Sequence, residues 1–298
     1  MIINRTNMAG LQVAFKKNFE GAFSAGEVLY KKVATVVPST TATEAYPWLG
    51  QIPRIREWIG ERVIRSITTE GYQLTNKPFE QTITVPRTAI EDDTYGVFSP
   101  LFAAIGDSAR VFPDELVFGA LAKGFQINCY DGQFYFDTDH PVRQDDGSTV
   151  AVSNMQAGAS TPWFLLDLGK PVKPLIFQDR KKFEFVAKDD PNTSDDVFMR
   201  NEFLYGVYGR MAAGHAFWQL AFGSKASLDK ANFDAAYDSM TSLKGDEGRP
   251  LGIKPTVLVI PPSLRNAANE IVTVQRLASG ADNPNYKIVD VMIAPWLA

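Results

Sequence analysis

The chain has 298 residues, of which 45% are hydrophobic and 21% are charged, and its formal net charge is -4. These values are typical of a folded globular protein of one or two domains and exclude a disordered chain. The longest basic run covers only Arg180 to Lys182, so the positive footprint of a non-specific nucleic-acid binder is missing. The single cysteine excludes an internal disulfide, and a reducing cell interior fits it. Because no apolar run reaches about 18 residues and Met1 to Gly10 is unlike a secretion signal, we expect no membrane contact.

Residues 1–45 predict an N-terminal arm made of a short helix and an extended linker. Leu11, Phe15 and Phe19 recur at helical spacing, and the pattern then fades into the Pro- and Thr-rich segment from Val37 to Thr43. The segment is too weakly patterned to form a domain of its own.

Residues from Arg62 to Val85 predict a long β-hairpin with its turn at Asn76 to Pro78. Tyr72 and Leu74 alternate with polar residues before the turn, and Phe79 begins a second alternating run after it. The hairpin has too few apolar residues for a core of its own. It must therefore pack on the rest of the chain or reach a neighbouring subunit.

A long helix is expected next, capped by Ser99 with Pro100 at its first position. Pro113 either kinks this helix or divides it into two consecutive helices. The Gly-, Asp- and Ser-rich residues 130–162 predict turns, and the stretches Trp163 to Val186 and Val197 to Phe222 predict strands of a buried sheet.

The last quarter predicts a compact unit of mixed helix and strand. A helix runs from Leu228 towards Leu243, and Thr256 to Ile260 is an apolar strand that ends at two prolines. Ser263 then caps a further helix, and a final strand runs from Ile288 to Ile293.

The two histidines, His140 and His215, limit the catalytic chemistry that the chain can carry. His140 follows Asp137 and Asp139, which could approach a hard cation, but the same residues form an ordinary turn with hydrogen-bonded carboxylates. His215 lies among apolar residues, as a core or interface histidine does. Cys129 follows an apolar helix, which is typical of an inert buried thiol.

Gly106, Asp107 and Ser108 resemble the nucleophile block of some esterases, although Ala109 stands where those enzymes carry leucine. The motif falls inside a helical pattern, which makes Ser108 a poor nucleophile. We therefore expect no catalytic residue, no cofactor and no metal ion.

Several segments, in the same order and over nearly the full length, resemble the major head subunit family of Mu-like tailed bacteriophages. The segments are Phe134 to Pro141, Trp163 to Asp167, Lys173 to Gln178, Tyr205 to Arg210, Phe217 to Ala221, Asp246 to Gly252, Leu258 to Pro262, Asn283 with Pro284, and Ala294 to Leu297. The resemblance implies an α+β capsid fold of the Hong Kong 97 type, whose subunits form the hexamers and pentamers of an icosahedral head.

This resemblance implies four regions: an N-terminal arm (1–45), an E-loop hairpin region (46–93), a peripheral domain with a long spine helix (94–222) and an axial-domain-like unit (223–298). It also implies that the hairpin and the arm contact neighbouring subunits. The candidate contact residues are Thr75, Asn76, Lys77, Pro78, Phe79, Leu11, Phe15 and Phe19. A covalent crosslink at Lys77 is not expected, because no acidic partner is evident.

The partners that the resemblance implies are further copies of the chain, a scaffold, a maturation protease and a portal, with double-stranded DNA packed inside without specific binding. Assembly would take place in the host bacterial cytoplasm, and the product would be part of the virion. We expect no long scaffolding segment before the arm. Two alternatives are a hydrolase that uses Ser108 with His140 and a self-associating tail or baseplate protein.

Overall fold

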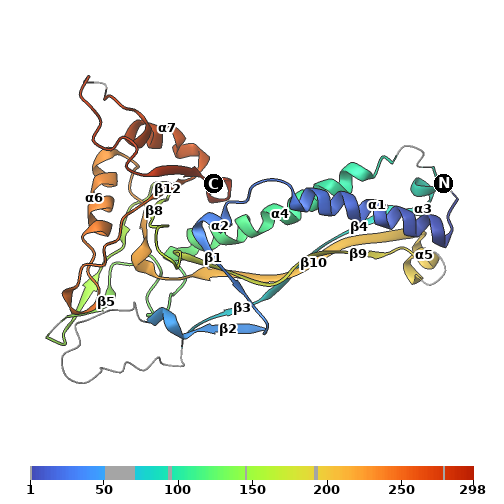
Figure 1. The fold of residues 1–298 in the computed structure, drawn as a ribbon, viewed down its shortest axis with the longest axis horizontal. Coiled ribbons are helices and arrows are strands. Elements are labelled where there is room, and N and C mark those ends of the chain that lie inside the picture. Colours follow the sequence, from blue (N-terminus) through green and yellow to red (C-terminus); the bar gives the residue numbers. More distant parts are fainter. Residues whose placement is uncertain (1, 51–70, 93–95, 145, 191–193, 278) are drawn as a thin grey trace.

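The computed structural model describes residues 2–50, 71–92, 96–144, 146–190, 194–277 and 279–298. The molecule is elongated, with two long helices lying along one face of a long sheet and a second sheet at the other end (Figure 1). Among the helices in these ranges, none is long and apolar enough to cross a membrane.

The long sheet has four strands in the order β1-β9-β10-β4. They are β1 (Ala34–Pro38), β9 (Leu175–Lys188), β10 (Glu202–His215) and β4 (Lys77–Pro86). β10 is antiparallel to both of its neighbours, whereas β1 is parallel to β9. Leu175 to Phe177 and Phe183 to Val186, which read as separate apolar runs, form one continuous strand.

Helices α1 (Arg5–Ser24) and α4 (Ser99–Ala122) pack on each other and cover one face of this sheet. An aromatic cluster joins the three layers: the ring centroids of Phe15 and Phe102 lie 3.9 Å apart, and Tyr205 on β10 meets Phe102 edge-on at 5.2 Å. Aromatic rings in such stacked and edge-on geometries stabilise a core beyond the area that they bury.

The N-terminal segment packs on the rest of the chain, and its helix is longer than the short helix that we expected. Its helix is 20 residues long, begins at an Asn4 cap whose side chain accepts from the Asn7 N–H at 2.8 Å, and packs along α4. The following linker forms the short helix α2 (Tyr30–Val33) and then β1, an edge strand of the long sheet. The apolar side of α1 finds its partner within the chain.

The hairpin with a turn at Asn76 to Pro78 is also wrong, and residues 62–70 of it lie outside the described residues. β3 (Tyr72–Thr75) pairs with β2 (Thr43–Tyr46), whereas β4 pairs with β10. Asn76 therefore lies where the chain passes from a two-stranded ribbon into the long sheet. Alternation revealed two strands correctly but could not reveal which strands they pair with.

α4 runs unbroken through Pro113, which confirms the single long helix of the two arrangements expected. Its cap is Phe98, one residue before the predicted Ser99, so Pro100 occupies the second helical position, where its missing N–H leaves no bond unmade. Short helices α3 (Arg87–Asp92) and α5 (Asp195–Arg200) flank the far ends of β4 and β10. A strand was expected from Val197, but residues 197–200 belong to α5, and β10 begins only at Glu202.

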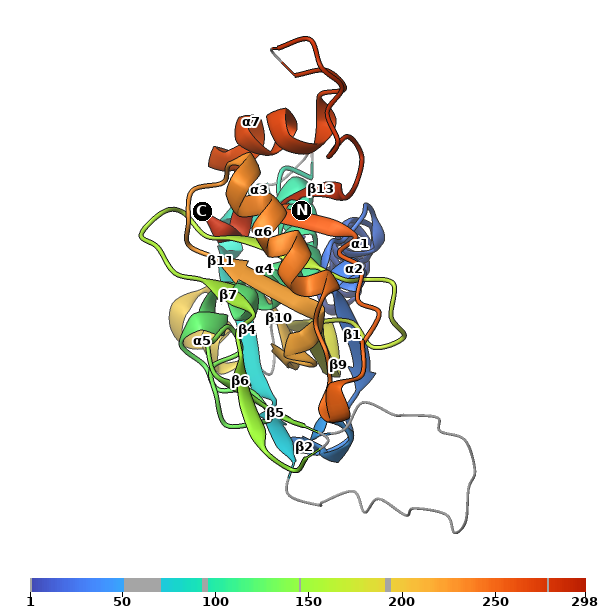
Figure 2. The ribbon, with the colours of Figure 1, turned by 90° about the vertical axis from the view of Figure 1, so that its left-hand side faces the viewer.

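The second sheet has five strands in the order β13-β12-β8-β11-β7. They are β13 (Asp290–Ile293), β12 (Val257–Ile260), β8 (Trp163–Leu166), β11 (Ala221–Ser224) and β7 (Met155–Gln156). Helix α6 (Lys230–Thr241) packs against β11, and α7 (Arg265–Ala268) packs against β12 (Figure 2). The helix expected after Ser263 is thus a single α-turn that continues as a π-helical segment, Asn269–Thr273.

This sheet takes strands from both sides of the boundary that we expected at residue 222, so β7, β8 and β11 group with the C-terminal unit. The region expected to hold only turns contains β7 and the ribbon of β5 (His140–Arg143) with β6 (Thr149–Val152). The C-terminus connects the second sheet to α4, because Trp296 stacks on Phe118, near the end of that helix, with ring centroids 5.7 Å apart.

Candidate assembly surfaces and buried polar clusters

The predicted contact residues of the N-terminal segment lie inside this chain. Phe15 and Phe19 are each only 2% exposed, and Leu11 is partly buried against the same core. Phe15 and Phe19 are therefore unavailable to a neighbour in this conformation, which corrects their proposed role. Their helical spacing indicated a buried face, but did not tell whether this chain or another one buries it.

The five predicted contact residues around Asn76 divide into two groups. Asn76 is buried: its side-chain NH₂ donates to Ser39 Oγ at 2.8 Å and to the Thr41 carbonyl at 2.9 Å. Phe79 is half-buried against Phe112, with ring centroids 4.7 Å apart. Three residues remain exposed on the ribbon and on β4: Thr75, Lys77 and Pro78. A contact of these three with a neighbouring subunit stays a prediction.

Both edge strands of the long sheet carry features that hinder the addition of another strand. β1 ends at Pro38, and β4 contains Pro78 and Pro86, which lack an N–H group. Lys77 and Glu80 on β4 are exposed as well. Because proline and charge disfavour pairing at an open edge, contacts between subunits are expected to use side-chain surfaces instead.

One such surface was missed by the sequence analysis. Figure 1 shows that the N-terminus, α3, α5 and the start of α4 lie together at one end of the molecule. Large apolar side chains at this end are exposed: Ile2 by 78%, Val97 by 68%, Leu101 by 42%, Val186 by 50% and Met199 by 76%. We call these five residues the apolar end surface. Exposed large apolar side chains at one end of a molecule are candidates for an association surface.

His140 belongs to a buried polar cluster with Cys129 and Asp131. Asp131 Oδ2 lies 2.7 Å from His140 Nδ1, and the Cys129 thiol donates to Asp131 Oδ1 at 3.0 Å. Burial acts to raise the pKa of Asp131, but the bonds from His140 and Cys129 outweigh it and leave this pKa lowered. Burial, helped by the neighbouring carboxylate, raises the pKa of the Cys129 thiol. A thiol held in its protonated form is a poor nucleophile.

The second histidine is held at the C-terminal end of α4. His215 Nε2 donates to the Ala120 carbonyl at 2.9 Å, and the ring stacks on Tyr135 with centroids 4.3 Å apart. Ser108 is exposed on the same helix, twelve residues before Ala120, which places it roughly 18 Å away along the axis. His140 is fully buried within its own cluster. The structure therefore does not bring Ser108 together with a histidine base.

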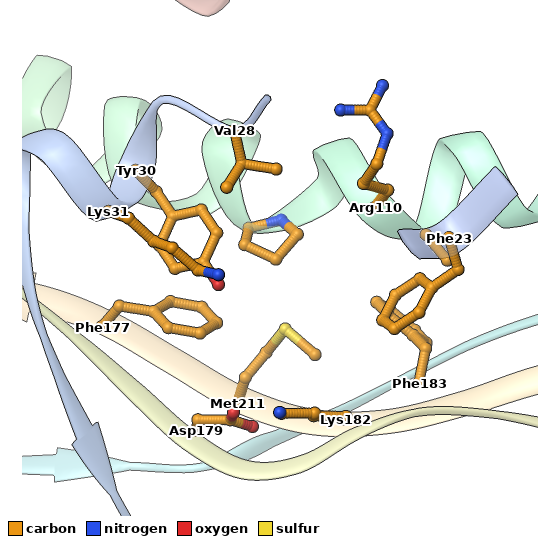
Figure 3. Close-up of a pocket in the computed structure, with 12 residues that line it drawn as sticks. Phe23, Val28, Tyr30, Lys31, Arg110, Phe177, Asp179, Lys182, Phe183 and Met211 are labelled. Atoms are coloured by element: carbon orange, nitrogen blue, oxygen red, sulfur yellow. The ribbon is translucent and has the colours of Figure 1, made fainter. Parts of the chain in front are cut away.

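A pocket of about 140 Å³ lies between the connector from α1 to α2, helix α4 and strands β9 and β10 (Figure 3). Its walls are largely aromatic and apolar, including Phe23, Phe177 and Met211. Asp179 is the one carboxyl among the described lining residues, and burial raises its pKa while Lys182 and Lys31 act to lower it. Without a histidine, cysteine or serine among those lining residues, the pocket offers no nucleophile and base.

Comparison with solved structures places this fold among the shell subunits of bacteriophage heads. The chain matches a chain of the procapsid of bacteriophage JBD30 with a TM-score of 0.87 at 47% identity, covering 99% of this chain and 100% of that one. It matches the bacteriophage JBD30 capsid with a TM-score of 0.80 at 37% identity, and both chains are fully covered. The fold is thus the Hong Kong 97 type expected from the sequence.

The sequence comparisons narrow the class to one family. The major capsid protein of Escherichia phage Mu is 41% identical over 289 residues, which are 94% of this chain and 93% of that protein. The Mu-like prophage FluMu major head subunit of Haemophilus influenzae is 42% identical over 269 residues, with 88% and 87% of the two chains covered. The family profile of the Mu-like prophage major head subunit gpT matches residues 8–297. The chain belongs to this family, so the resemblance is confirmed and the tail or baseplate alternative is wrong.

Proposed function

We propose that this chain assembles with copies of itself into the hexamers and pentamers of an icosahedral head that encloses a phage genome. The observation that carries the proposal is similarity over the whole length, at 47% identity, to a chain of a phage procapsid. The apolar end surface and the exposed side chains of β3 and β4 are the parts that we assign to contacts between subunits.

We also propose that the chain acts without catalysis. The separation of Ser108 from both histidines and the raised pKa of the Cys129 thiol support this proposal. We further expect Lys77 to form no covalent crosslink, so that boiled shells would run as single chains of 32.9 kDa on a denaturing gel.

The partners that we propose besides the chain itself are a scaffold, a maturation protease, a portal and the packaged double-stranded DNA. The net charge of -4 supports a wall that encloses DNA without gripping it, because tight binding to phosphates requires clustered Lys and Arg. Assembly in the host bacterial cytoplasm is part of the same proposal.

The experiment that tests the proposed function is electron microscopy with light scattering on the purified full chain, alone and with scaffold co-expressed. Closed shells, capsomer rings or curved sheets would support it. Tubes, or a chain that stays monomeric or dimeric at high concentration under both conditions, would contradict it. The assay needs no guess of a substrate, so it also separates assembly from a hydrolase activity.

A further inference from the structure

The cluster of Cys129, Asp131 and His140 brings three different kinds of donor atom together. Cys129 and Asp131 lie on the turn that follows α4, and His140 is the first residue of β5. The thiol sulfur, the carboxylate oxygen and the imidazole nitrogen all lie within 4.8 Å of one another. Cys129 is 6% exposed and His140 is 0% exposed, so these two side chains are shielded from water.

The neighbouring Asn154 fixes the orientation of the His140 ring. The Asn154 NH₂ group donates to the carbonyls of Tyr135, Trp218 and Ala221 at 2.8, 3.3 and 3.3 Å. Its carbonyl oxygen therefore faces His140 Nε2 at 3.2 Å. Stacking on Trp218, with ring centroids 4.0 Å apart, holds the plane of the ring.

The other ring nitrogen, His140 Nδ1, points at Asp131 Oδ2 across 2.7 Å, which is a hydrogen-bond distance. The Cys129 sulfur lies 3.0 Å from the other oxygen of the same carboxylate. A metal ion that takes the place of the bonding protons would find a nitrogen, an oxygen and a sulfur donor already side by side.

We propose that Cys129, Asp131 and His140 form a site for a divalent transition-metal ion of the zinc type. Nitrogen, oxygen and sulfur donors together suit this borderline-soft cation better than magnesium or calcium, which take oxygen ligands. With Nδ1 bound to the metal ion, Nε2–H would donate to the Asn154 carbonyl oxygen, which is the outer hydrogen bond that orients a metal-binding histidine. The Gln133 N–H, which donates to Asp131 Oδ1 at 3.1 Å, supports the carboxylate in the same way.

Charge balance favours the same ion. A thiolate and a carboxylate together neutralise a divalent cation, so the loaded site adds no net charge to a buried region. The Cys129 thiol loses its proton to solvent as the metal–sulfur bond forms, so binding weakens as the pH falls. The Asp131 side chain is 11% exposed, so the ion can reach the site from solvent on this side. A water molecule can bind there as the fourth ligand.

These three candidate ligands differ from the ones that the sequence suggested. Asp137 accepts from the N–H groups of Phe134 and Thr138, and Asp139 is exposed. His140 instead faces Asp131, nine residues before it, and a thiol that spacing alone did not connect with it.

Cobalt titration of the full-length chain, freed of metal with a chelator, tests the proposal. We expect one equivalent of Co²⁺ to bind and to produce thiolate-to-cobalt charge-transfer absorption, which Zn²⁺ then displaces. Cys129→Ser keeps a donor to Asp131 but removes the thiolate, so the charge-transfer band should be lost. Asp139→Asn is the matched control on the same loop and should leave the titration unchanged.

Two outcomes would overturn the proposal. If the folded wild-type chain gives no charge-transfer band, hydrogen bonds alone join His140, Asp131 and Cys129. If cobalt binds equally to wild type and Cys129→Ser without that band, the ion sits elsewhere on the surface. If Cys129→Ser fails to fold, the test rests on the wild-type chain alone: its charge-transfer band and its cobalt-to-protein ratio then support or overturn the proposal. The result is independent of whether the chain forms shells.

Discussion

At the scale of single residues, Gly106 shows how a motif that resembles an enzyme signature serves packing instead. A Cβ atom at this position would lie 2.4 Å from the backbone carbonyl oxygen of Phe19. The glycine is therefore what lets α1 approach α4 so closely. Gly119, on the same helix, has no atom within 4 Å of such a Cβ.

We predict that Gly106→Ala destabilises the unassembled subunit by about 1–3 kcal/mol, because the obstructing atom belongs to a helix backbone and cannot move alone. Gly119→Ala is the matched control and should gain about 0.5–1 kcal/mol, since alanine is the better helix former. Urea denaturation curves measure both changes. Equal stability of wild type and Gly106→Ala would mean that the two helices do not pack as described.

The stability of the subunit depends on pH through His215. Burial lowers its pKa from 6.5 to about 4, so the unfolded chain takes up the proton at a higher pH than the folded chain does. The contribution of the neutral ring is therefore complete above pH 6.5 and is lost as the pH falls towards 4. We predict that the stability advantage of wild type over His215→Gln shrinks across this window. Urea midpoints at several pH values would test it, and parallel curves for the two proteins would contradict it.

At the scale of elements, a polar cluster joins β1, β2 and the start of β4. Glu44 Oε1 accepts from the N–H groups of Thr40 and Thr41 at 2.9 and 3.0 Å and from Ser39 Oγ at 2.8 Å. Asn76 binds the same loop through Ser39 and Thr41. These bonds fix the place where the two-stranded ribbon leaves the long sheet.

The Glu44 carboxylate makes this junction sensitive to pH. The backbone bonds from Thr40 and Thr41, with that from Ser39, lower the pKa of Glu44 from 4.5 to about 2. A lowered carboxyl pKa stabilises the fold above pH 4.5, and the stabilisation is lost as the pH falls through 2. We predict that Glu44→Gln is less stable than wild type at neutral pH and that the difference narrows below pH 4.5. Thermal melts at pH 7 and pH 3 would show this, and a difference that persists unchanged would refute it.

At the scale of the whole molecule, two sheets stand at opposite ends of an elongated body, and the apolar end surface lies at the end away from α6 (Figure 1). Its five residues come from four separate segments of the chain, before α1, around the start of α4, at the end of β9 and in α5. Such a surface is assembled only by folding.

We predict that Met199→Glu folds normally but raises the protein concentration needed for shell formation by about tenfold or more. A charge buried without a partner costs more than the roughly 1.4 kcal/mol that corresponds to a factor of ten. Met199→Leu keeps the side chain apolar and should assemble like wild type. Light scattering against concentration measures the threshold. If Met199→Glu assembles like wild type, α5 does not take part in contacts between subunits.

The sequence by itself determined the family and many of the elements. Local periodicity records which side of a segment is buried, so the long helix from residue 99, the apolar strands of the last quarter and the helix towards Leu243 were all predicted. The seven quoted segments and the C-terminal tail were enough to identify the phage head subunits.

Only the tertiary structure decided the partners of these elements. It paired β3 with β2 and β4 with β10, buried Phe15 and Phe19 within the chain, and placed β8 beside β12. It also brought Cys129 and Asp131 to His140 and gathered the apolar end surface. The physical reason is that a pattern of apolar residues fixes how much surface a segment must bury. Which of several apolar surfaces buries it depends on packing between residues far apart in the chain.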